Sequence, residues 1–220
     1  KMNNNFSLSH RGQEPENGVL YLVGTPIGNL LDISSRAINI LTKVNLIACE
    51  DTRRTKKFLS ALKISNKMIS FNEHNSLKKI PKIIEKLNFG YSIALVSDAG
   101  LPGICDPGEN LVKATRLNGL ETICIPGACA ALTALLASGL PSSKFIFEGF
   151  IPKKNSARKE ALQRISSNQE TTILYESPHR LKKLLLELKS FCGGDRKIHI
   201  ARELTKKYEE HIGDDIDNLI

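Results

Sequence analysis

The sequence predicts an α/β protein with two domains and mostly parallel sheets. Short apolar runs alternate with amphipathic segments along the chain, which is the pattern of strands joined by helices. A break of glycine, proline and serine at 139–143 divides this alternation into two parts. With 220 residues and 41% hydrophobic side chains, the chain can form a hydrophobic core of ordinary size.

The part before the break contains the strands of an expected N-terminal domain over 18–140. These strands are 19–23, 46–49, 68–71, 92–96 and 121–125. The segments between them are expected helices, and the last of these, 130–137, stops before Gly139, a residue typical of a helix C-terminus. Residues 1–17 are polar and lack an apolar period, so we expect them to form a mobile arm.

The part after the break, 141–220, is expected to be a second α/β domain with longer and more basic helices. Its expected strands are 144–150, 171–175, 197–202 and 208–212. Its expected helices cover 156–165 and 181–188.

Amino-acid composition and net charge indicate which kinds of molecule the protein binds. Lys+Arg 31 against Asp+Glu 23 gives a net charge of +8, which favours a polyanionic partner. No apolar run approaches the roughly 20 residues that span a bilayer, and no leader precedes a cleavage site, so we expect a cytoplasmic protein without a membrane partner. The five cysteines lack zinc spacing, which predicts reduced thiols and no metal. Because aromatic residues are only 5%, platforms for stacking single-stranded bases are expected to be sparse.

Four unusual loops follow expected strands of the first domain. They are 24–29, 50–55, 97–108 and 126–131. The carboxyl ends of parallel strands lie at one edge of a sheet, where ligands bind, so we expect the four loops to converge there. Asp98 and Asp106 offer carboxylates to a small, polar, partly cationic ligand, whereas neither a dinucleotide fingerprint nor a P-loop is present. The alternative is that these glycines and prolines only form tight turns.

Seven motifs in order resemble the ribosomal RNA small subunit methyltransferase I family of the tetrapyrrole methylase superfamily. They are GTPIGNL, ACEDTRRT, SDAGLPGICDPG, PGACAALTAL, EGFIP, YESPHR and ARELTKKYEE. The resemblance implies a tetrapyrrole methylase-like (class III methyltransferase) fold of two α/β domains with the active cleft between them, and a homodimer. It also implies methyl transfer from S-adenosylmethionine to the ribose 2′-oxygen of a cytidine in the decoding region of small-subunit (16S) rRNA.

The resemblance assigns the cofactor site to loops that the strand pattern also singles out. The implied cofactor-binding residues are Thr25, Pro26, Ile27, Asp98, Ala99, Gly100, Leu101, Pro126, Gly127, Cys129, Ala130 and Tyr175. Cys129 departs from the family, where serine is frequent, and the lost hydroxyl would cost about 0.5 to 1.5 kcal/mol of cofactor binding unless the main chain makes the contact. Family members continue beyond Ile220, so we expect the last strand and helix of the second domain to be missing and the domain over 141–220 to be truncated.

By their positions in these loops, six residues are candidates for the base that accepts the hydroxyl proton: Glu50, Asp51, Asp98, Glu176, His179 and Glu203. Glu176 is favoured, and Asp51 and Glu203 are kept beside it. Each has a structural alternative or a competing role. Asp51 can cap the helix that begins near Thr52 or pair with the arginines that follow it, and Glu203 can pair with Arg202.

Basic residues beside these loops are the expected RNA contacts, because cations near the reacting groups can bind phosphates. They are Arg53, Arg54, Lys56, Lys153, Lys154, Arg158, Arg180, Arg202 and Lys206. For each lysine, the alternative is an ordinary solvated position.

The sequence is also compatible with two other functions. One is methylation of a tetrapyrrole, another small molecule or a protein side chain by an enzyme of the same superfamily. The other is an RNA-binding or cofactor-sensing relative without catalysis, which turnover of bound cofactor would distinguish.

Overall fold

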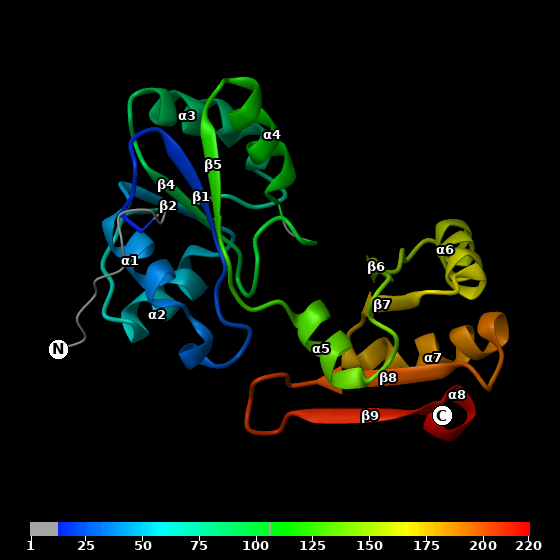
Figure 1. Ribbon diagram of the computed structural model, residues 1–220. Coiled ribbons are helices and arrows are strands. Elements are labelled where there is room, and N and C mark those ends of the chain that lie inside the picture. The colour runs from blue at the N-terminus through cyan, green and yellow to red at the C-terminus, as the bar shows by residue number, and fades with distance from the viewer. Residues whose placement is uncertain (1–12, 106) are drawn as a thin grey trace. The chain divides into compact units, whose positions relative to one another are not determined.

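The structure is a computed structural model that describes residues 13–105 and 107–220 (Figure 1). The expected arm therefore lies outside the described residues over 1–12, as does Asp106 in the third loop. The chain divides into two compact units, one up to Ala128 and one from Cys129, and each is described by itself. Within the described residues, no helix has the length and apolar character needed to cross a membrane.

The first unit is built on a parallel five-stranded sheet in the order β3-β2-β4-β1-β5. The strands are β1 (Val19–Val23), β2 (Leu46–Cys49), β3 (Met68–Ser70), β4 (Ile93–Val96) and β5 (Glu121–Ile125). Every residue of β2 and β4 is buried, which explains why these strands read as continuous apolar runs. This sheet confirms the predicted α/β class.

Helices cover both faces of this sheet. They are η1 (Leu30–Asp32), α1 (Ser35–Lys43), α2 (Thr52–Ala61), α3 (Ser76–Asn88) and α4 (Glu109–Leu117). Apolar residues of α1 and α2 pack on one face, and those of α3 and α4 pack on the other. Glu14, which lies in the expected arm, forms an ion pair at 2.7 Å with Lys43 at the end of α1. This part of the arm therefore contacts the folded unit.

The second unit contains two separate pairs of strands. Its elements are α5 (Ala130–Ser138), β6 (Phe145–Phe150), α6 (Asn155–Ser167), β7 (Thr171–Tyr175), α7 (Pro178–Cys192), β8 (Lys197–Arg202), β9 (Glu210–Asp215) and α8 (Ile216–Leu219). Strands β6 and β7 are parallel, whereas β8 and β9 form an antiparallel pair. The last strand therefore begins two residues later than predicted, because its register is set by pairing Arg202 with Glu210.

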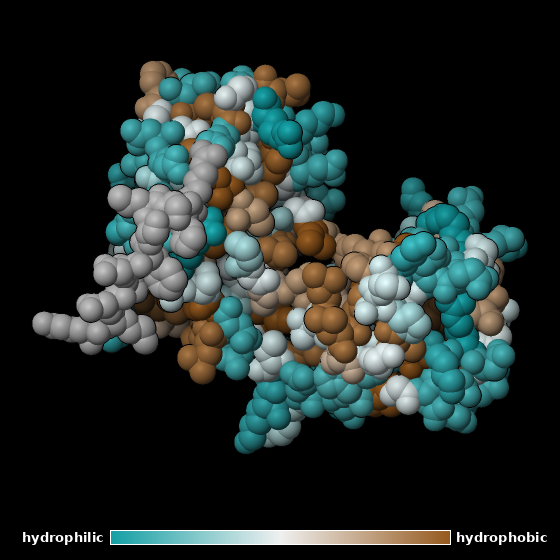
Figure 2. Space-filling model, in the orientation of Figure 1, coloured by the Kyte–Doolittle hydropathy of each residue, from teal (hydrophilic) through white to brown (hydrophobic). Residues whose placement is uncertain are grey.

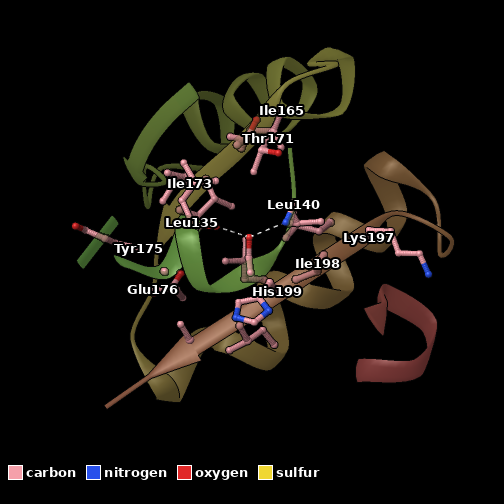
Figure 3. Close-up of a pocket in the computed structure, with 18 of the residues that line it drawn as sticks. Leu135, Leu140, Ile165, Thr171, Ile173, Tyr175, Glu176, Lys197, Ile198 and His199 are labelled. Carbon is pink, nitrogen blue, oxygen red and sulfur yellow. Dashed lines mark hydrogen bonds between the residues drawn. The ribbon is translucent and has the colours of Figure 1, made fainter. Parts of the chain in front are cut away.

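A cavity of about 1130 Å³ lies within the second unit between β7, β8, α5 and α7. In Figure 3, Thr171 and Ile173 of β7 lie on one side and Ile198 and His199 of β8 on the other, with Leu135 of α5 between them. Because α5 contacts β7, β8 and β9, it belongs to the second unit, and the division falls before α5 rather than at the expected boundary near Pro141.

Candidate functional site

The loop after β1 and the loop after β4 are joined by their main chains. The amide of Thr25 donates to the carbonyl of Gly100 at 2.9 Å, and the amide of Gly100 donates to the carbonyl of Thr25 at 3.1 Å. Gly100 has a φ of 80°, a conformation that glycine adopts without a steric penalty. These bonds fix the position of the predicted cofactor residues in both loops.

The loops after β1 and β5 meet at two glycines. The amide of Gly24 donates to the carbonyl of Ile125 at 3.1 Å. A Cβ atom on Gly24 would lie 2.7 Å from the Cα of Gly127, which is too close for any side chain. The approach of these two main chains therefore requires glycine at position 24, a residue that is absent from the predicted cofactor set.

Asp98 connects the loop after β4 to the start of α2. Its Oδ1 accepts the amide of Asp51 at 3.3 Å, and its Oδ2 accepts Nη1 of Arg54 at 3.1 Å. The carboxylate is 23% exposed, so it remains accessible to a ligand. Loops after β1, β2, β4 and β5 are thus held together at one edge of the sheet, as the strand pattern predicts.

Asp51 caps helix α2, which confirms the structural alternative for this residue. Its Oδ1 accepts the amide of Arg53 at 2.8 Å and that of Arg54 at 3.5 Å. The amide and the guanidinium of Arg53 lower the pKa of the Asp51 carboxyl. The geometry therefore assigns the Asp51 carboxylate to the N-terminus of α2.

Glu176 follows β7 and is held by two donors. Its Oε1 accepts the amide of Ser177 at 2.7 Å and Nε of Arg180 at 2.9 Å. Its side chain is largely buried, and Glu176 lines the same cavity as Tyr175. Arg180 therefore fixes the orientation of a carboxylate that still has an acceptor oxygen.

Glu203 lies in the exposed connection between β8 and β9, with a φ of 51°. It pairs with Lys206 at 3.1 Å, and not with Arg202, which pairs with Glu210. The candidate base Glu203 and the candidate phosphate ligands Arg202 and Lys206 thus all take part in exposed ion pairs. Such pairs contribute little to stability and exchange readily for a phosphate.

The predicted RNA contacts divide into exposed and buried cations. Arg53, Lys56, Lys153 and Lys154 are exposed, and Figure 2 shows a hydrophilic surface over α6. Arg158 is different, because its side chain is only 10% exposed.

The guanidinium of Arg158 joins α6 to α7. Its Nε lies 3.0 Å from each carboxylate oxygen of Glu187, and its Nη2 lies 2.5 Å from Oε2. This pair lowers the pKa of Glu187 and raises that of Arg158. The geometry assigns Arg158 to the packing of the second unit.

The profile of the tetrapyrrole (corrin/porphyrin) methylases matches residues 19–220. The chain belongs to this family. Among curated relatives, the ribosomal RNA small subunit methyltransferase I of Vibrio cholerae is 48% identical over 202 residues, which are 92% of this chain and 70% of the relative. The protein of the same name from Bacillus subtilis is 49% identical over 203 residues, covering 92% of this chain and 69% of the relative.

Solved structures of this family share the fold. The cobalt precorrin-4 methyltransferase aligns with a TM-score of 0.65 at 16% identity, covering 97% of this chain and 90% of that one. A uroporphyrin-III-C-methyltransferase from Thermus thermophilus aligns with a TM-score of 0.61 at 17% identity, covering 92% of this chain and 87% of that one. These likenesses confirm the class III methyltransferase fold.

Tetrapyrrole methylases use S-adenosylmethionine, and the first unit offers a donor set that fits it. The Asp98 carboxylate can accept hydrogen bonds from hydroxyl or ammonium groups. Ile27 lies close to Gly100 and Leu101 lies close to Gly24, so the same loops also offer apolar contacts. The Gly24–Gly127 approach keeps side chains out of the space where these loops meet. Of the other predicted cofactor residues, Cys129, Ala130 and Tyr175 belong to the second unit. Cys129 stands at the N-cap of α5, and its thiol makes no capping bond.

Four residues of the second unit are absent from the predicted site. Phe147 and Phe150 of β6 contact the ring of the predicted residue Tyr175, and His199 and His211 form a hydrogen-bonded pair at 3.0 Å. The motif EGFIP marks the end of β6, but the face on which its aromatic side chain lies depends on an irregularity that the sequence pattern does not reveal.

Proposed function

We propose that this chain is an S-adenosylmethionine-dependent rRNA (cytidine-2′-O-)-methyltransferase. Its substrate would be a cytidine ribose in the decoding region of small-subunit rRNA. The observation that carries this proposal is the similarity, over most of the chain, to relatives named ribosomal RNA small subunit methyltransferase I. The net charge of +8 supports a polyanionic substrate.

In this proposal, the strand-end loops of the first unit hold the cofactor. S-adenosylmethionine supplies an electrophilic methyl group. Thr25, Gly100 and Gly127 fix the loop main chains, while the Asp98 carboxylate binds polar hydrogens of the cofactor. Because these loops are already connected by hydrogen bonds, little ordering is needed on binding, which favours the in-line alignment that methyl transfer requires.

Glu176 is the proposed proton acceptor. The ribose 2′-hydroxyl gives its proton to Oε2 of Glu176 while its oxygen forms the new bond to the methyl carbon. Arg180 acts as a positioning residue, since its bond to Oε1 fixes the carboxylate. Asp51 and Glu203 are weaker candidates, because one caps α2 and the other lies in an exposed ion pair.

Exposed cations form the proposed RNA surface. They are Arg53, Arg54, Lys56, Lys153, Lys154, Arg202 and Lys206, and the half-buried Arg180, which also holds Glu176, borders them. Arg158 is left out because it is buried against Glu187. Replacing Lys56 by alanine should flatten the dependence of log K on log salt by about 0.7 to 0.9. Lys67, at the opposite edge of the sheet just before β3, is the matched control and should leave the slope unchanged.

We also propose that the enzyme acts in the cytoplasm as a homodimer. Leu31 is 90% exposed beside the loop after β1, and an apolar side chain so exposed suits an interface between copies. Sedimentation of the purified chain and of Leu31→Asp tests this, with a dimer expected for the first and dissociation for the second.

The deciding experiment measures transfer of a labelled methyl group from S-adenosylmethionine to small ribosomal subunits that lack the modification. Naked rRNA and a tetrapyrrole precursor are assayed alongside, and the labelled nucleoside is mapped. Label on a cytidine ribose 2′-oxygen is the expected result. Label on the tetrapyrrole alone would overturn the proposal in favour of a small-molecule methyltransferase, and bound cofactor without turnover would indicate a non-catalytic relative.

Glu176→Gln tests the assignment of the base. It keeps an acceptor oxygen for Arg180 but cannot take up the proton, so kcat should fall about 100-fold or more while the cofactor Kd stays unchanged. Glu203→Gln is the control and should retain activity. Equal losses in both variants would contradict the choice of Glu176.

A further inference from the structure

One face of the β6–β7 pair carries three aromatic rings in contact. Phe147 and Phe150 each meet Tyr175 edge-on, with ring centroids 5.3 Å and 5.5 Å apart. Edge-to-face contacts of this kind are favourable and hold each ring in a defined orientation. Aromatic residues are only 5% of this chain, so a cluster of three on one face points to a specific role for that face.

A β-bulge brings the two phenylalanines to the same face. Side chains three positions apart on a regular strand point to opposite faces. Here the register shifts between Phe147 and Gly149, and Gly149 has a φ of 65°. As a result, Phe147 lies opposite Ile173 and Phe150 lies opposite Tyr175, and Ile173 and Tyr175 share a face of β7. The bulge therefore builds the aromatic cluster.

The cluster is turned away from the core of the second unit. Leu174 and Ile151 pack with α6 and α7, and Gly149 is buried on that side. On the other side, Phe147 is 37% exposed and Phe150 is 56% exposed. Packing of the core thus explains one face of the pair. On the other face, Phe150 and Tyr175 line the cavity, and the rings of Phe147 and Phe150 remain partly exposed.

Cations lie at both ends of the strand that carries these rings. Lys144 directly precedes β6, and Lys153 and Lys154 follow it closely; all three are exposed. Cations on both sides of a row of exposed aromatic side chains suit a single-stranded nucleic acid, because phosphates contact the cations while bases stack on the rings. An apolar partner would gain nothing from the lysines, so the charge favours RNA over a second copy of this basic chain.

We propose that Phe147 and Phe150, supported by Tyr175, form a stacking platform for an unpaired base of the RNA substrate. This inference rests on the proposed function and adds to it a means of holding an unstacked nucleotide. Stacking tolerates any base, so the platform contributes affinity and position, and base identity is read elsewhere.

The test uses the full chain and a single-stranded RNA oligonucleotide that contains 2-aminopurine, whose fluorescence falls when it stacks. Phe150→Leu keeps an apolar side chain but removes the ring, and its Kd should rise about tenfold with loss of quenching. Phe150→Tyr keeps the ring and should bind as the unmodified chain does. Phe89→Leu, at an exposed position after α3 in the first unit, is the control and should change nothing.

The dependence of binding on salt separates stacking from charge. Phe150→Leu should weaken binding at every salt concentration without changing the slope, because no phosphate contact is lost. Unchanged affinity and quenching in both Phe147→Leu and Phe150→Leu would overturn the platform. Dissociation of a dimer by these substitutions, with RNA affinity per chain unchanged, would overturn it too and identify the face as an interface between copies.

Methyl transfer in the same preparations distinguishes the platform from the proposed function. If the unmodified chain methylates the small subunit and the phenylalanine variants do so with equal kcat/KM, the platform alone is wrong. If the unmodified chain neither methylates RNA nor binds the oligonucleotide, the proposed function fails and the platform fails with it. A melting temperature for each variant confirms that it is folded.

Discussion

The two units hold their functional residues by different means. In the first unit, main-chain bonds between Thr25 and Gly100 and the approach of Gly24 to Gly127 fix the loops. In the second unit, side chains hold these residues in place through two ion pairs, Arg180 with Glu176 and Arg158 with Glu187. A site made from main chain is sensitive to the size of a residue, whereas a site made from ion pairs is sensitive to the loss of a partner.

The largest effect is expected from removing one partner of the buried pair in the second unit. Arg158→Met leaves the Glu187 carboxylate without its cation, which should cost about 3 to 5 kcal/mol in the free energy of unfolding. Urea unfolding of the full chain measures this. Arg164→Met, which removes an exposed pair with Glu148, is the control and should cost less than about 1 kcal/mol.

The double variant Arg158→Met/Glu187→Leu sharpens this prediction. Removing both charges should restore most of the lost stability, because the penalty comes from the unpaired carboxylate. A single variant as stable as the unmodified chain would show that Arg158 is not part of the packing, and would return it to the set of RNA contacts.

An effect of intermediate size is expected from adding a methyl group in the first unit. Gly24→Ala should cost about 1 to 3 kcal/mol, since its Cβ would lie 2.7 Å from the Cα of Gly127 and the loops must separate. Calorimetric titration should also show a cofactor Kd raised tenfold or more. For Gly119→Ala, the new Cβ meets no neighbour, and cofactor affinity should be unchanged. Equal affinity in the two variants would contradict the role of the glycine contact.

The smallest effect concerns pH. Burial, and then the neighbouring His211, lowers the pKa of His199, so the unfolded chain binds a proton at higher pH than the folded chain does. Stability from this group is complete above the ordinary histidine pKa and is lost as the pH falls through the folded value. Urea midpoints at pH 7.5 and 5.5 should therefore differ less in His199→Gln than in the unmodified chain. An identical pH dependence would exclude this contribution.

The sequence predicts the strands best where both faces are buried. Segments 19–23 and 46–49 are confirmed to the residue, because continuous apolar runs define them. Segment 121–125 is confirmed to the residue as well, although only Ile125 in it is buried. The division between units is harder, since the apolar helix α5 precedes the break at Pro141 but packs on β7 and β8. The elements against which a helix packs depend on tertiary contacts, and the local pattern of apolar residues does not predict them.

The site was predictable where topology decides it. Parallel strands bring their following loops to one edge, so the convergence of Thr25, Asp98 and Gly100 follows from the strand pattern. The role of Arg158 was not predictable, because its partner Glu187 lies 29 residues away and meets it only through the packing of α6 on α7. The aromatic face was likewise hidden, because a regular strand would separate Phe147 from Phe150.

The two strand pairs of the second unit also affect how the protein must be handled. Strand β7 pairs with β6 and β8 pairs with β9, and over the described residues no strand joins one pair to the other. The amides and carbonyls along such an edge can hydrogen-bond to an extended segment of another molecule. Protein concentration is therefore a variable to control, because aggregation by strand pairing would begin in this unit.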